Sequence, residues 1–457
     1  MSFMEKIVKM DPKEIASRPA VKALWDKGFF WSLAHRRVFK YLRGFDMPHD
    51  GFWDYKKVKE IVPLDEVETA LLCWAAAGTT GLIRNDLPIE GVFTHQSFEG
   101  RTYPAGCNTW YDHLLFCNDD GVFHYTPHVP TKVVEIQTQD DVEVIFRAFK
   151  EGVTKLDLPP IREDQQGRLA HGQRGRAFKP GMTVFCPVVG LTIHTIHALL
   201  NNFNAPTPEQ RMVFYDDIVK KPAGVQKWID NGFLKGAETI PLSAFDAYLL
   251  GSVATAAGMQ IQNLLVCQAA MGLGGAPLGG VNYVMLMGGT PTMRGLGFRW
   301  ASDKRGYPYP VGIDGVFGAH LPPYMSIDEA VDDCVGMVVG PNGRYDPEVK
   351  EGQEVMYPGF SPKPRAVHRP FKDPDRYCKA VTANEVFSLE AIQACKDCCN
   401  YIYNTYGRIP VMGDPFFLPA VVQTFHMDPD LYDEYYVEGS IWQEQRDHLI
   451  IWHGMDE

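Results

Sequence analysis

The stretch AYLLGSVATAAGMQIQNLLVCQAAMGLGG, Ala247 to Gly275, decides the fold. It is almost free of charge and rich in Ala, Gly, Leu and Met, which predicts a long helix buried on most of its circumference. Its length would allow a membrane span. Several amide side chains inside the stretch argue against a lipid-facing helix, namely Gln260, Gln262, Asn263 and Gln268. We therefore predict the central core helix of a soluble domain, with no membrane partner.

The glycine-rich run LGGAPLGG follows this predicted helix. Its glycines permit left-handed backbone and end the helix, and the apolar run from Tyr283 to Met287 predicts a buried strand. A helix that closes on such a turn leaves backbone N–H groups free to face a ligand at close range. An ordinary connection from helix to strand explains the same residues equally well.

The bulk properties exclude several classes of protein. The chain has 457 residues and a formal net charge of −12, without a Lys/Arg block, so nucleic acid is not an expected partner. The N-terminus has no apolar core with a small-residue cleavage site, so we expect no secretory signal. The ten cysteines form no disulfide-like framework, which suits the reducing cytoplasm.

Cationic side chains gather early in the chain. Residues 12 to 43 are predicted to be helical, with prolines at 12 and 19 near the starts of two helices. The second helix is expected to run through LAHRRVFKYLRG, which contains His35, Arg36, Arg37, Lys40 and Arg43. Two guanidinium groups and an ammonium can grip one phosphate. A solvated basic face is the simpler interpretation of this segment taken alone.

Two further segments complete the pattern. Pro63 to Glu66 predicts the start of a helix, VETALLCWAAAGTTG, with an acidic first turn. The small-residue loop from Pro104 to Asn108 precedes a predicted strand, Tyr111 to Cys117, which forms a hairpin with Val122 to Tyr125. Such a loop can admit a flat ring, and it can equally be a simple turn.

The ordered set of segments, RRVFK, then PLDEVETALLCWAAAGTTG, then RTYPAGCNTWYDHLLF, then NLLVCQAAMGLGGAPLGG, resembles the nitroreductase family of FMN-dependent oxidoreductases. The resemblance covers about residues 30 to 295 and is nearest to the branch that includes azoline oxidases. It implies an α+β fold, with a central, mainly antiparallel sheet flanked by helices, a long buried central helix and a homodimer.

The resemblance also implies cofactor-binding residues. The family's basic start, which holds the FMN phosphate, is matched by Arg36 and Lys40 with Arg37 beside them, while Val38 replaces the usual serine. The loop along the flavin ring is matched by Pro104, Ala105, Gly106 and Asn108, and the turn near the flavin by Pro277, Gly279 and Gly280. Arg294 and Arg299 are candidates for closing the phosphate site.

The activity that the resemblance implies is FMN-dependent oxidation or reduction of a small conjugated or aromatic organic substrate. NAD(P)H is the electron donor of many family members. The chemistry would come from the flavin, so no catalytic side chain is assigned. A flavin-binding sensor or partner subunit without turnover of its own is the alternative.

The size of the chain predicts additions to such a domain. We expect an N-terminal helical segment at 1–30, an FMN domain at 31–300 with an insertion around 155–245, and a C-terminal extension at 301–457 that packs on the core or on a partner subunit. The insertion includes a polar, arginine-containing loop (REDQQGRLAHGQRGRAFKPG), expected to be exposed. His426 and Tyr432, in the aromatic tail, are candidates for contacting substrate.

Two groups of residues resemble metal ligands. His194 and His197 lie three residues apart, without a third ligand nearby in sequence. Cys395, Cys398 and Cys399 fall within a predicted helix, two of them on its apolar stripe, so buried thiols are favoured over a cluster. The sequence therefore predicts no metal site.

Overall fold

The computed structural model describes most of the chain. The described residues are 1–47, 53–82, 99–104, 112–126, 136–163, 175–236, 239–290, 293–338, 354–355, 363–364, 372 and 387–455.

The helix α9 (Leu242–Met271) confirms the long helix that the sequence predicts. It begins five residues earlier than predicted, directly after Pro241, because a proline cannot lie within the helix interior. It ends before Gly272, which adopts a left-handed backbone with φ of 82°. A Cβ atom at Gly272 would lie 2.4 Å from the carbonyl oxygen of Glu444, so only glycine fits there.

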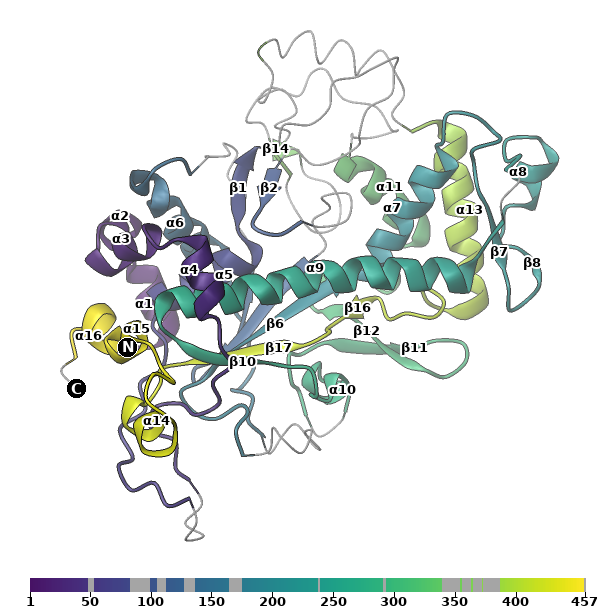
Figure 1. Cartoon of the computed structure of the whole chain (residues 1–457). Coiled ribbons are helices and arrows are strands. Elements are labelled where there is room, and N and C mark those ends of the chain that lie inside the picture. Colours follow the sequence, from purple (N-terminus) through teal and green to yellow (C-terminus); the bar gives the residue numbers. More distant parts are fainter. Residues whose placement is uncertain are drawn as a thin grey trace.

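A seven-stranded sheet forms the centre of the fold (Figure 1). Its strands are β3 (Asp112–Asn118), β4 (Gly121–Tyr125), β5 (Val153–Lys155), β6 (Thr183–Gly190), β10 (Gly274–Leu278), β16 (Phe416–Phe417) and β17 (Val421–Phe425). The order is β10-β17-β6-β3-β4-β5, with β16 also paired to β6, and every pairing is antiparallel. The α+β class with an antiparallel sheet and helices is therefore confirmed. Strand β17, from the far C-terminal part of the chain, lies inside this sheet.

The glycine-rich run is itself a strand, β10, rather than a turn before one. The strand predicted over Tyr283 to Met287 is wrong, because Tyr283–Leu286 form the short helix α10. The side chain of Asn282 accepts a hydrogen bond from the backbone N–H of Met285 and begins this helix. A run of five apolar residues does not distinguish a strand from a helix by periodicity.

The N-terminal region consists of short helices, and part of the helical prediction is wrong. The helices are α1 (Phe3–Lys9), α2 (Pro12–Ala16), α3 (Pro19–Trp25) and α4 (Phe29–His35). Residues 36–40 form no helix, and Arg36 already has extended backbone. The next helix, α5 (Glu66–Ala77), begins at its predicted position, where Asp65 and Glu68 form a capping box.

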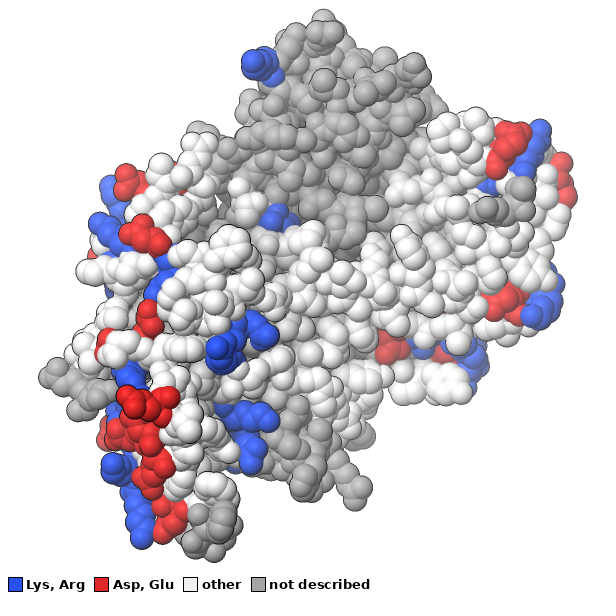
Figure 2. All heavy atoms as spheres, viewed as in Figure 1, with Lys and Arg blue, Asp and Glu red and all other residues white. Residues whose placement is uncertain are grey.

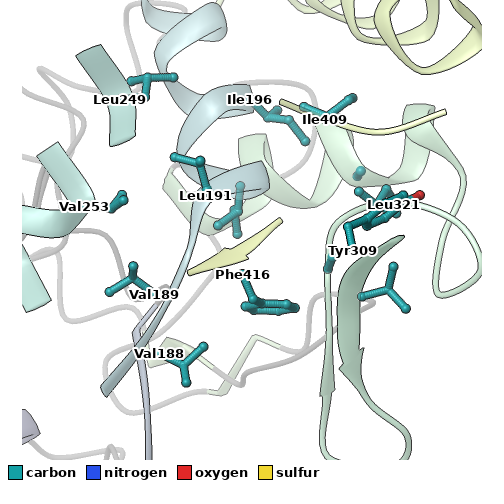
Figure 3. Packing of buried hydrophobic residues seen from close by; sticks show 14 of the residues in the cluster. Val188, Val189, Leu191, Ile196, Leu249, Val253, Tyr309, Leu321, Ile409 and Phe416 are labelled. Atoms are coloured by element: carbon teal, nitrogen blue, oxygen red, sulfur yellow. The ribbon is translucent and has the colours of Figure 1, made fainter. Parts of the chain in front are cut away.

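Hydrophobic side chains from distant segments pack around the sheet. On one side of β6, the helices α7 (Leu191–Phe203), α11 (Ile327–Val338) and α13 (Leu389–Tyr406) gather with α9. Figure 3 shows this packing, in which Val189 near the end of β6 and Leu191 at the start of α7 lie between Leu249 and Val253 of α9 and Phe416 of β16. The helix α6 (Glu143–Gly152) packs with α5 in a second cluster.

The remaining described elements are short. They are β1 (Thr79–Leu82), β2 (Glu99–Arg101), a 3-10 helix at Gln139–Val142, β7 (Val213–Asp216), β8 (Lys221–Pro222), α8 (Gln226–Asp230), β9 (Thr239–Pro241), β11 (Arg299–Ser302), β12 (Pro308–Ile313), β13 (Phe317–Gly318), β14 (Glu354–Val355), β15 (Lys363–Pro364), α14 (Pro429–Tyr435), α15 (Gln443–Arg446) and α16 (His448–His453).

Helix α9 is buried along one side only, although burial on most of its circumference was predicted. Its outer side carries Tyr248, which is 73% exposed, and Met259, which is 38% exposed. Two of its amides lie inside the protein, and Gln268 donates from Nε2 to Thr424. Among the described helices, α9 is the one long and apolar enough to cross a membrane, judged by length and composition alone.

Candidate functional site

The cationic segment after α4 lies against the glycine-rich strand β10. The backbone N–H of Phe39 donates to the carbonyl oxygen of Gly275, at 3.0 Å. Three residues later, Leu42 forms an isolated bridge with Met427, just after β17. Because β10 is the first strand in the sheet order, its outer edge is available to this segment. Residues more than 230 positions apart in sequence are thereby fixed side by side.

The three predicted cations of this segment differ in their surroundings. Arg37 donates from Nη1 to the carbonyl oxygens of Ala34 and Arg36, and its guanidinium lies 5.2 Å from the ring centre of Trp442. Arg37 therefore caps the end of α4. Arg36 and Lys40 are half-buried, and within the described part of the chain neither forms an ion pair. These two cations are free to bind an anion.

The outer part of β10 and the turn after it are open. Pro277 and Gly279 are exposed, whereas Leu278 between them is buried. A Cβ atom placed on Gly279 would find no atom within 4 Å, but one placed on Gly275 would lie 2.5 Å from the carbonyl oxygen of Gln423. Gly275 is therefore required by close packing. Gly279 leaves space beside the strand.

A further arginine lies near this segment. The guanidinium of Arg176 is 5.5 Å from the ring centre of Tyr41, and Gln423 Nε2 donates to the Arg176 carbonyl oxygen. Since Gln423 pairs with Ala276 of β10, Arg176 belongs to the same neighbourhood as Lys40. The sequence placed Arg176 in a polar loop and did not assign it to the phosphate site. The available signal was its place in the basic sequence RGR, beside Arg174.

Arg294 and Arg299 lie elsewhere. Arg294 donates from Nη2 to the carbonyl oxygen of Asp157, just beyond β5, the strand at the opposite end of the sheet order from β10. Arg299 lies 3.6 Å from the Asp314 carboxylate. Arg294 and Asp314 border an open pocket of about 560 Å³, between the end of β5 and the start of β11. None of these contacts places Arg294 or Arg299 beside Arg36 and Lys40, where the predicted phosphate site would need them.

The predicted ring-binding loop is described only at its start. Pro104 is exposed, and Thr102, two residues earlier, accepts a hydrogen bond at 2.8 Å from Asn263 Nδ2 of α9. This part of the loop therefore lies against α9. Ala105, Gly106 and Asn108 lie outside the described residues.

Tyr432 lies beneath the cationic segment and is buried. Its hydroxyl oxygen accepts a hydrogen bond from the backbone N–H of Tyr41, at 3.2 Å, and its ring meets the ring of Phe39 edge to face. Burial raises the pKa of Tyr432, so the phenol stays neutral. His426 is also buried. Neither side chain has the exposure that a residue contacting substrate would need.

The remaining metal-ligand candidates are buried without forming a described metal-binding group. His194 and His197 lie inside α7, where burial lowers the pKa of His194 to about 4. The three cysteines of α13 are buried and free, and burial raises the pKa of Cys395 and Cys398 well above the usual range. The prediction of buried thiols is confirmed.

The sequence matches no protein-family model and no curated protein. One solved structure with partial similarity is described as a "putative nitroreductase" from Ralstonia eutropha JMP134. It is 15% identical to this chain, with a TM-score of 0.27, and the match covers 56% of this chain and 71% of that one. A likeness at this level assigns no function, so the functional argument rests on the residues of the site.

Proposed function

We propose that this chain binds FMN and is an oxidoreductase that acts on a small conjugated or aromatic organic substrate. The observation that carries the proposal is the hydrogen bond between Phe39 and Gly275, which holds unpaired cations beside an open, glycine-rich strand. An FMN molecule combines a phosphate with a flat ring. Such a ligand needs a cationic site next to a surface that backbone can approach closely.

The residues present fit the two ends of FMN. Arg36 and Lys40 would hold the phosphate, with Arg176 as a third cation. Pro277, Gly279 and Gly280 would offer backbone to the ring, because Gly279 leaves open space beside the strand. Bound FMN would supply transfer of electron pairs, and the protein would orient it and exclude competing reactions.

The experiment that tests the proposal begins with the purified chain. We expect an absorption spectrum of oxidised flavin, and the mass of FMN in the extract of the denatured protein. Anaerobic addition of NADH or NADPH should bleach the flavin band, and an added quinone or nitroaromatic compound should restore it. Bound FMN that no donor and acceptor turn over would favour a sensor or partner subunit. A protein that binds no flavin would refute the proposal.

We also propose that the chain forms a homodimer through α9 and α4. Figure 2 shows a broad band without charged side chains along α9, and basic side chains below it near β10. The outer side of α9, which is about 45 Å long, carries Tyr248 and Met259. Helix α4, packed on α9, adds Phe30, which is 84% exposed. An uncharged surface that exposes large apolar side chains is typical of an interface between subunits.

A further inference from the structure

Three histidines and one glutamate meet inside the protein, next to the cationic segment, because the backbone N–H of Arg43 donates to the carbonyl oxygen of His426 at 2.7 Å. Glu68 lies in the first turn of α5, His426 directly follows β17, and His448 and His453 begin and end α16. The side chains of Glu68, His426 and His448 are at most 3% exposed, and that of His453 is 15% exposed. One ligand atom from each residue lies within 4.8 Å of the others.

The hydrogen bonds of two histidines fix where their protons lie. His426 Nδ1 is 2.8 Å from the carbonyl oxygen of Val62, and His448 Nδ1 is 2.7 Å from that of Met271. A carbonyl oxygen only accepts, so Nδ1 must donate in both rings. In the neutral form of each ring, Nε2 then carries a lone pair and no proton.

Both Nε2 atoms point at the same carboxylate oxygen. Glu68 Oε1 lies 2.7 Å from His426 Nε2 and 2.6 Å from His448 Nε2. Between neutral rings and a carboxylate these contacts would be repulsive, because all three atoms are acceptors. A positive charge must therefore lie among them. Two protons on two buried imidazoles could supply it, or a single metal cation could.

The third histidine favours the metal. His453 Nε2 lies 3.3 Å from Glu68 Oε1, which is close enough for an ion pair. This buried nitrogen nevertheless has no hydrogen-bond partner within the described residues. A metal ion would use this third nitrogen as a ligand. A proton on His426 or His448 would leave it without a partner. The second oxygen of Glu68 is already occupied, because it accepts from the backbone N–H of Asp65 at 2.8 Å. One oxygen and three nitrogens thus converge.

We propose that Glu68, His426, His448 and His453 bind one Zn²⁺ ion. Three imidazole nitrogens and one carboxylate oxygen form a typical tetrahedral zinc ligand set. Ligand atoms of tetrahedral zinc lie about 3.3 Å apart, given metal–ligand distances of about 2.0–2.1 Å. To reach this spacing, the two nearer nitrogens, at 2.7 and 2.6 Å from Glu68 Oε1, would move away by about 0.6–0.7 Å, and ligand atoms up to 4.8 Å apart would move closer together. The carbonyls on both Nδ1 atoms are the outer-shell partners that orient zinc-bound histidines.

The burial of the site indicates a structural role. The neighbouring cavity, bordered by His426 and His448, has a volume of about 10 Å³, which is room for about one water molecule. With four protein ligands, the ion has no open position for a substrate. It would join α5 to the end of β17 and to α16, and so fix the C-terminal helices on the core. The chain between Glu68 and His448 spans 380 residues.

The test uses the full chain, purified without a histidine tag and dialysed against metal-free buffer. Elemental mass spectrometry should find one zinc per chain. Removal of zinc with a strong chelator should lower the melting temperature, and added Zn²⁺ should restore it. Reconstitution with Co²⁺ should give the intense visible absorption of a tetrahedral nitrogen and oxygen site.

Variants separate a metal site from a hydrogen-bonded cluster. His453→Ala removes the most exposed ligand, so the protein should still fold and bind zinc at least about 10-fold more weakly. Glu68→Gln should also weaken the binding of zinc. His194 is a buried histidine on α7, outside the cluster, so His194→Ala should leave the content at one zinc per chain. A wild-type chain that holds no zinc, and whose melting temperature responds to neither chelator nor Zn²⁺, would overturn the proposal. Flavin content does not enter this test, so its outcome is separate from that of the proposed function.

Discussion

The backbone N–H of Phe39 donates to the carbonyl oxygen of Gly275, and this one contact brings the two ends of the proposed flavin site together. Phe39 itself is buried against Tyr432, so the segment that carries Arg36 and Lys40 is anchored on the protein. A fixed backbone holds the cations in place before a ligand arrives, which lowers the entropic cost of binding.

The cations should recognise the phosphate of FMN and nothing else in the cofactor. We expect Arg36→Ala and Lys40→Ala each to weaken FMN binding by about 10-fold or more, since a charge-assisted hydrogen bond contributes about 1.5–3 kcal/mol. Binding of riboflavin, which lacks the phosphate, should not change. Calorimetric titration of both flavins into each variant measures the difference.

Arg147→Ala is the matched control for these two variants. Arg147 lies on α6 and pairs with Glu143 within the same helix, on the surface. Its removal should leave the affinity for FMN unchanged. If Arg36→Ala weakened riboflavin and FMN equally, the assignment of Arg36 to the phosphate would be wrong.

Two glycines of the same run should respond in opposite ways to alanine. Gly279→Ala should leave the free energy of unfolding within about 0.5 kcal/mol of wild type, because the new methyl group meets no atom within 4 Å. Gly279→Ala should weaken the binding of FMN if the flavin ring lies against this turn. Gly275→Ala should cost about 1–3 kcal/mol, because its Cβ would lie 2.5 Å from the Gln423 carbonyl oxygen. Denaturant unfolding and FMN titration of both variants give the comparison.

The sequence was informative where one segment carries its own signal. The capping box at Asp65 places the start of α5, and the apolar length of α9 sets the frame of the fold. The antiparallel sheet was predicted only through the family resemblance, not from the signal of any one segment. Periodicity did not distinguish strand from helix at Tyr283, because five apolar residues satisfy both patterns.

Contacts between distant segments could not be predicted in this way. β17 lies in the sheet between β10 and β6, but the sequence of Val421–Phe425 alone does not predict which strands will be its neighbours. The histidine cluster was missed for the same reason, since Glu68 and His426 are separated by 358 residues. The pair His448 and His453 on one short helix was the available sequence signal.

The proposed dimer depends on the uncharged side of α9. We expect the wild-type chain to elute as a dimer, and Tyr248→Glu combined with Met259→Glu to halve the mass, because two buried carboxylates per subunit would be desolvated at the interface. Light scattering coupled to gel filtration measures the mass. Val437→Glu, at a residue that is 83% exposed outside this surface, should remain dimeric. A wild-type chain that is monomeric at micromolar concentration would contradict the proposal.

Asp246, buried in α9, should make the stability depend on pH. Burial raises its pKa from 3.8 to about 7, so the folded state holds a proton that the unfolded state releases near pH 4. The stability therefore falls as the pH rises from about 4 to about 7, by up to about 4 kcal/mol. Asp246→Asn keeps an acceptor for the backbone N–H of Met412 and removes the charge. Its melting temperature should exceed that of wild type by an amount that grows from pH 4 to 7 and is constant above; a difference independent of pH would contradict this assignment.

Asp216 joins the β7 strand to helix α13 through one buried carboxylate. Its oxygens accept from the hydroxyls of Tyr401 and Tyr406, at 2.8 and 2.7 Å, and from the backbone N–H groups of Ile218 and Val219. Asp216→Ala would leave four donors without this acceptor, so we expect a loss of about 3 kcal/mol or more in the free energy of unfolding. Tyr401→Phe removes one donor and leaves the others paired, so its cost should be about 1 kcal/mol. Denaturant unfolding of both variants measures the ratio. Equal losses would show that the carboxylate acts through Tyr401 alone, and that the turn after β7 does not depend on it.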